Sequence, residues 1–94
     1  MEVITGKTSH GFEFAIEASK LDSYELVKRL RASEDDITEI VDIIPLLFGP
    51  EGEANLMKAL GDNPSFTGMV AEVKEAFGII KEHQTGKKSS SLPN

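Results

Sequence analysis

Ile43-Ile44-Pro45-Leu46-Leu47-Phe48-Gly49-Pro50 is the stretch that decides how this chain folds. Pro45 removes one backbone donor and crowds the preceding turn, so we expect a kink or break near residues 43–44. Gly49 then stops the apolar segment, and Pro50 suits the first turn of a new helix. The pattern predicts two separate helices here, over residues 36–48 and 52–60.

One further helix is expected on each side of this pair. Before it, Asp22 is a good N-cap with Glu25 three residues later, as in a capping box, which indicates a helix over residues 23–31. After it, Ser65 or Thr67 can cap a helix over residues 67–83. That last helix carries an apolar stripe formed by Met69, Val70, Val73, Phe77 and Ile80.

The beginning of the chain has the pattern of strands. Phe12, Phe14 and Ile16 alternate with Glu13, Ala15 and Glu17, which is the period of a half-buried strand. Residues 6–11 have turn composition, so an antiparallel hairpin over residues 2–17 is predicted. The expected fold class is α+β, with an N-terminal β-hairpin followed by a mostly α-helical body of about four helices. Residues 1–84 form one domain in this interpretation, and residues 85–94 form a disordered tail.

Composition excludes several classes of protein. The chain has 94 residues, a formal net charge of −6 and no cysteine, so disulfides and thiolate metal sites are excluded. Its longest apolar run, residues 43–48, is far shorter than the roughly 20 residues of a membrane span. The folded part offers no positive footprint for nucleic acid. We therefore expect a soluble intracellular protein that binds neither membrane nor nucleic acid.

The sequence contains no pattern typical of an active site. His10 and His83 have no second ligand at helical spacing, so both are expected at the surface without a metal ion. Asp35-Asp36 is typical of a helix start. The glycines at 49 and 52 lack the lysine and the spacing of a phosphate loop. We expect a non-enzyme with no cofactor.

Apolar residues exceed what a single stripe requires. Ile43, Phe48 and Met57 cannot easily all turn inward in so small a domain, and exposed apolar residues rimmed by charge often mark a partner surface. Together with Leu46 they are the predicted partner-binding residues. The same apolar excess predicts that the protein forms homo-oligomers.

The order of these segments resembles the tail assembly chaperones of long-tailed bacteriophages of Gram-positive hosts. Two departures from the family pattern are Tyr24, where tryptophan is more usual, and Phe48, inserted before the glycine of a Leu-Leu-Gly-acidic turn. The resemblance covers about residues 1–90 and rests on Gly11-Phe12-Glu13-Phe14, Leu21-Asp22-Ser23-Tyr24-Glu25-Leu26, Ile44 to Glu51, Leu56 to Leu60, Asp62-Asn63-Pro64 and the helix from Met69.

The resemblance implies a role in viral tail assembly. Such proteins bind the long helical tape measure protein and keep it soluble until tail tube protein polymerises around it; the tail tube protein is a further candidate partner. They act in the host cytoplasm and are absent from the mature virion. Many members also occur as a frameshifted long form, and a 94-residue chain corresponds to the short form.

Two other functions stay open. An acidic inhibitor that mimics nucleic acid, of the anti-restriction or antirepressor type, would suit the net charge of −6. It requires a regular stripe of carboxylates, whereas acids and bases are interspersed here. A structural component that joins phage head and tail is the other, and it would require oligomer contacts.

Overall fold

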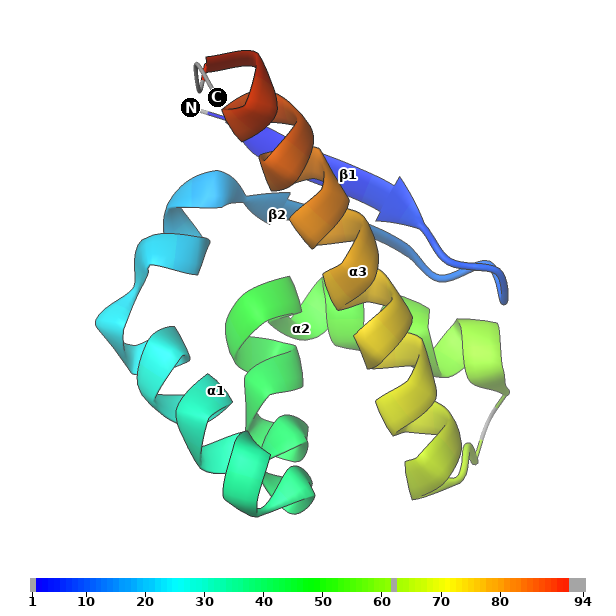
Figure 1. Ribbon diagram of the computed structural model, residues 1–94. Coiled ribbons are helices and arrows are strands. Elements are labelled where there is room, and N and C mark those ends of the chain that lie inside the picture. The colour runs from blue at the N-terminus through cyan, green and yellow to red at the C-terminus, as the bar shows by residue number, and fades with distance from the viewer. Residues whose placement is uncertain (1, 62, 92–94) are drawn as a thin grey trace.

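The computed structural model describes residues 2–61 and 63–91 and shows a hairpin followed by helices (Figure 1). In chain order the elements are β1 (Val3–Lys7), β2 (Glu13–Glu17), the 3-10 helix η1 (Ala18–Asp22), α1 (Tyr24–Asp35), the 3-10 helix η2 (Ile37–Glu39), α2 (Ile40–Leu60) and α3 (Phe66–Ser91). The predicted α+β class and N-terminal hairpin are confirmed. The described residues form three α-helices instead of about four.

The hairpin pairs β1 and β2 antiparallel, with Ile4 opposite Ile16 and Gly6 opposite Phe14. The side chains of Ile4, Phe14 and Ile16 are buried, while the residues that alternate with them in β2 are exposed, as the period of two predicted. β1 packs on α3 and β2 packs on α2, so the buried face of this small sheet rests on both helices (Figure 1).

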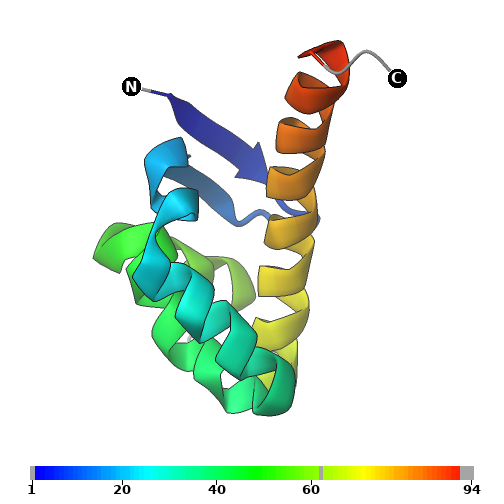
Figure 2. The same cartoon turned by 60° about the vertical axis from the view of Figure 1, so that its left-hand side comes forward.

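Gly6 lies where β1 packs closely on α3. A Cβ atom at this position would lie 2.6 Å from Cζ of Phe14 and 2.8 Å from Cγ2 of Ile79. Any larger residue would therefore push β1 away from the helix. Figure 2 shows α3 along one side of the molecule, with α1 and α2 forming the other side.

The first helix begins one residue later than the sequence suggested. Ser23 is the N-cap of α1, and its Oγ accepts a hydrogen bond from the backbone N–H of Leu26 at 3.3 Å. The predicted cap, Asp22, is wrong because that residue belongs to η1. Leu26 is buried, and α1 continues to Asp35, beyond the expected end at residue 31.

The expected helices over residues 36–48 and 52–60 are joined in α2, which bends sharply at Gly49 (Figure 1). Gly49 has φ 77° and ψ 172°, a conformation open to glycine and closed to other residues. Pro50 follows, and a proline disfavours helical angles in the residue before it. The predicted break at Gly49 is confirmed, whereas the kink expected near residues 43–44 is wrong, because Pro45 is accommodated inside the helix.

The last helix runs further than expected in both directions. α3 begins at Phe66, where Ser65 Oγ accepts a hydrogen bond from the N–H of Gly68 at 3.0 Å. It continues as helix to Ser91, whereas a disordered tail was expected from residue 85; residues 92–94 of that tail lie outside the described residues. None of the helices in the described ranges combines the length and apolar character that crossing a bilayer requires.

Three aromatic rings join the hairpin to the bend of α2. The ring centroid of Phe48 lies 5.2 Å from that of Phe12 and 5.6 Å from that of Phe14, both in edge-to-face arrangement. The Phe12 and Phe14 rings are 5.6 Å apart. Edge-to-face pairs add to the free energy of burying the rings, so this cluster fixes the hairpin on α2.

Candidate functional site

The four predicted partner-binding residues lie in different environments. Ile43 is fully buried, and only 6 % of Phe48 is exposed. Leu46 is half-buried, and 37 % of Met57 is exposed. Of the three residues that were not all expected to turn inward, Met57 stays exposed, whereas Ile43 and Phe48 are buried. The bend at Gly49 leads the chain under the hairpin and places Phe48 among the hairpin's aromatic rings.

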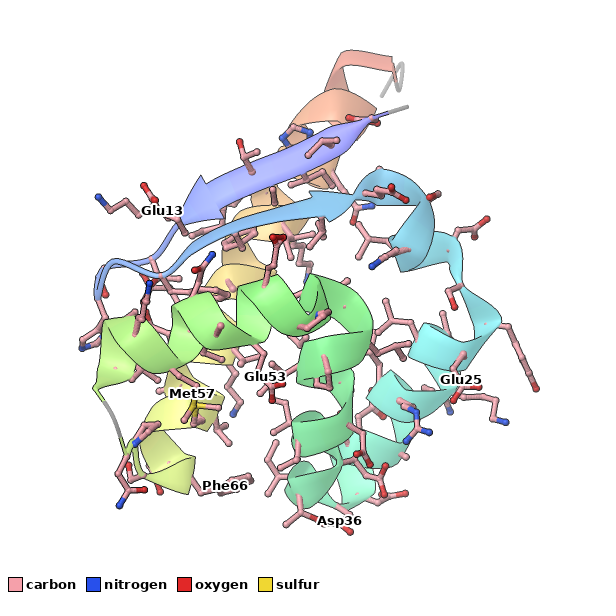
Figure 3. All side chains as sticks on the ribbon, turned by 180° about the vertical axis from the view of Figure 1, so that it is seen from behind. Glu13, Glu25, Asp36, Glu53, Met57 and Phe66 are labelled. Carbon is pink, nitrogen blue, oxygen red and sulfur yellow. The ribbon has the colours of Figure 1, made fainter. Side chains whose placement is uncertain are left out.

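Met57 belongs to an apolar surface at the end of the molecule where α2 ends and α3 begins. Phe66, the first residue of α3, is 42 % exposed, and Figure 3 shows both side chains on the same side of the molecule. We define the α2–α3 surface as Met57 and Phe66; the half-buried Leu60, Met69 and Val70 of the same two helices pack against the core. Two large apolar side chains left open at one end of so small a protein make this surface suited to contact with another protein.

Charged groups border the α2–α3 surface. Glu53 lies one helical turn before Met57 on α2 and is half-buried (Figure 3). Lys58 follows Met57 directly and is exposed. An apolar centre with charged neighbours is the composition of a protein-binding patch.

Other exposed apolar side chains are distributed over β1, where Val3 lies, and over α1, η2 and the start of α2. Ile37 and Val41 are one turn apart, and Val27 lies on α1. Tyr24 has the ammonium of Lys28 5.5 Å from its ring centroid, which covers part of the ring with a cation. Single exposed apolar residues are common on soluble proteins, so these positions indicate a site less strongly than the α2–α3 surface does.

A polar cluster lies where the β1–β2 turn meets α3. Only 1 % of Glu72 is exposed. Thr8 Oγ1 donates a hydrogen bond to Glu72 Oε2, and His10 Nδ1 lies 2.8 Å from Glu72 Oε1. Ser9 donates to Glu75 from its backbone N–H at 2.7 Å and from its hydroxyl at 2.9 Å. Three consecutive turn residues thus contact two carboxylates on one face of α3.

The turn is shaped by its own hydrogen bonds. The N–H of Thr8 donates to the carbonyl of Phe12 at 3.0 Å, and the N–H of Gly11 donates to the carbonyl of Thr8 at 3.0 Å. Gly11 has φ 93°, which suits glycine. The Thr8 hydroxyl also accepts from the N–H of Phe12, so its own hydrogen is directed to Glu72. The sequence therefore presents Ser9 and His10 to α3 in a defined orientation.

Sequence reasoning missed this cluster because it looked for ligands near each histidine. His10 is exposed, as expected, but its partner Glu72 is 62 residues away. One signal was available: Glu72 lies between Met69 and Ala76 on the inward stripe of α3, and a carboxylate there needs polar partners.

The other carboxylates serve local roles. Arg29 on α1 lies 2.9 Å from Glu25 on the same helix and 3.4 Å from Asp42 on α2. Asp36 caps η2 and accepts hydrogen bonds from the hydroxyl and the N–H of Thr38. These bonds, the side-chain one first, lower the pKa of Asp36 below its ordinary value, so the group stays ionised. The helix start predicted for Asp35-Asp36 is therefore confirmed for Asp36, whereas Asp35 is the last residue of α1.

A shallow open depression of about 300 Å³ lies between the turn and α2. It is lined by Gly11, Glu13, Asn55, Lys58 and Ala59. Its walls are exposed and largely polar, so it lacks the apolar enclosure of a small-molecule site.

Comparison of the chain with protein-family models, with curated proteins and with solved structures finds no match.

Proposed function

We propose that this protein is a phage tail assembly chaperone that binds the tape measure protein through the α2–α3 surface and keeps it soluble during tail assembly. The observation that carries the proposal is the exposure of Met57 and Phe66 at one end of the fold. Methionine adapts to varied apolar partners, and phenylalanine contributes a large apolar contact area.

Charge supports the same role. The formal net charge of −6 keeps a complex soluble after its apolar surface is covered, and like charge opposes aggregation between complexes. A long helical partner exposes apolar stripes before assembly. An acidic protein with a small apolar contact can cover these stripes reversibly, because a small interface binds weakly.

The proposal revises the binding residues. Met57 stays, Leu46 is a half-buried candidate at the margin, and Phe66 is added. Ile43 and Phe48 are core residues and are no longer candidates for binding the partner. The site of action remains the host cytoplasm, with release before the virion is complete.

The test is co-expression with overlapping fragments of the tape measure protein encoded nearby, scored by fragment solubility and co-purification. Met57→Glu and Phe66→Glu should each abolish co-purification while leaving the circular dichroism spectrum and melting temperature nearly unchanged. Val27→Glu is the matched control, because it puts the same charge on an exposed apolar position of α1. Retention of the fragment by both test variants, or equal loss with Val27→Glu, would refute the assigned surface.

A further inference from the structure

We propose that His10, Glu72 and Glu75 form a binding site for a divalent metal ion, best suited to Zn²⁺, which fastens the β1–β2 turn to α3. The proposal does not depend on the function assigned above. It follows from the geometry and the charge of the polar cluster between these two segments.

The donor atoms have the right chemistry and spacing. One ring nitrogen of His10 and one carboxylate oxygen each from Glu72 and Glu75 lie within 4.8 Å of one another. Zinc binds imidazole nitrogen and carboxylate oxygen at about 2.0–2.2 Å, so two ligands of a tetrahedral ion are roughly 3.3–3.5 Å apart. His10 Nδ1 and Glu72 Oε1 are 2.8 Å apart, so an ion bound by both atoms would replace the hydrogen bond between them.

The charge of the cluster favours a cation. Glu72 is buried, and no lysine or arginine in the described part of the chain forms an ion pair with Glu72 or Glu75. His10 supplies at most one positive charge against two carboxylates. A buried carboxylate is costly unless its charge is compensated, and a divalent ion would neutralise both groups at once.

The surrounding hydrogen bonds orient the ligands. Thr8 holds Glu72 by its second oxygen, Oε2, which leaves Oε1 directed at His10. Ser9 holds Glu75 with two donors. Such outer partners fix ligand orientation in known metal sites, and each carboxylate oxygen retains a lone pair for the ion.

The location gives the ion access and a structural effect. The side chain of His10 is 65 % exposed, so an ion can enter from solvent, and the three ligands leave one tetrahedral position for water. The ion would link the N-terminal hairpin to the last helix. A two-stranded hairpin is marginal by itself, so this link should raise the stability of the whole chain.

The experiment is calorimetric titration of the full chain, pretreated with chelator, with ZnCl₂ at pH 7. We expect one ion per chain and a melting temperature that rises with ZnCl₂ concentration. His10→Ala and Glu75→Gln should each weaken binding at least tenfold; both positions are accessible enough for the fold to tolerate the change. His83→Ala and Glu82→Gln, which alter a histidine and a carboxylate elsewhere, should bind as the unmodified chain does.

An NMR titration of the two histidine rings distinguishes this site from non-specific binding. Zn²⁺ should shift the ring signals of His10 and leave those of His83 unchanged. The proposal is overturned by the absence of saturable binding below about 1 mM ZnCl₂, by unchanged affinity in His10→Ala, or by a shift confined to His83. Equal affinity for CaCl₂ would overturn the assignment to zinc, because calcium prefers oxygen ligands alone.

Discussion

Replacing Gly49 by alanine should destabilise the protein through the backbone alone. The bend of α2 needs φ 77° and ψ 172° at this residue, a region occupied essentially only by glycine. A Cβ atom there would meet no atom within 4 Å, so no steric clash contributes. Pro50 also prevents residue 49 from relaxing into the helical region.

The expected loss follows from two opposing terms. Holding a non-glycine residue in such a conformation costs about 1–3 kcal/mol. Loss of glycine's freedom in the unfolded chain returns about 0.4–1 kcal/mol. At the middle of both ranges the net loss is about 1.3 kcal/mol, and a domain of this size loses roughly 4–8 °C of melting temperature per kcal/mol.

Gly78→Ala is the matched control. Gly78 lies inside α3 and is exposed, and an alanine methyl group at this position would likewise have no atom within 4 Å. Because alanine is the better helix former, this variant should gain about 0.5–1 kcal/mol. Both variants are compared with the unmodified chain by urea unfolding and thermal melting. If Gly49→Ala were as stable as the parent, or gained stability as Gly78→Ala does, α2 would not be bent at Gly49.

Three further outcomes are expected. Phe48→Ala should lower the free energy of unfolding by about 3–5 kcal/mol, because it removes the ring that packs on Phe12 and Phe14. Urea unfolding tests this, and a loss below about 1 kcal/mol would mean that Phe48 is not part of the core. The stability that Asp36 contributes is complete above its ordinary pKa and is lost as the pH falls through its lowered folded pKa. NMR of the carboxyl group should therefore give a titration midpoint below the ordinary aspartate value. Asp36→Asn should remove this acid dependence of the stability. The protein should form homo-oligomers at micromolar concentration in sedimentation experiments, whereas a single monomeric species up to about 1 mM would contradict this.

Periodicity predicted the elements of the fold better than it predicted their breaks. The alternation of Phe12, Phe14 and Ile16 was sufficient for the hairpin, because a period of two assigns one face of a strand to the core. The break at Gly49 before Pro50 was predicted and is confirmed, whereas the additional kink expected near residues 43–44 was wrong. Pro45 is the stronger helix breaker by propensity, but Gly49 before Pro50 combines two restrictions at one step of the chain.

The candidate sites were harder to predict from the sequence than the fold was. Counting apolar residues indicated an excess, yet which of them remain outside depends on the direction α2 takes after Gly49. Met57 stays exposed, and Phe48 is covered by the hairpin. The contact of His10 with Glu72 depends on packing between segments that are 62 residues apart. A search for ligands a few residues from each histidine therefore does not detect it.

The packing of β1 on α3 also determines the order in which the chain can complete its fold. Gly6 packs against Ile79, and Thr8 donates a hydrogen bond to Glu72. The first strand therefore packs on the helix that is synthesised last. During translation the hairpin can form and pack on α2, but the side chain of Ile4 is not fully buried until α3 has been synthesised. A chain truncated within the last helix before Ile80 should therefore lose protection from proteolysis at its opposite end.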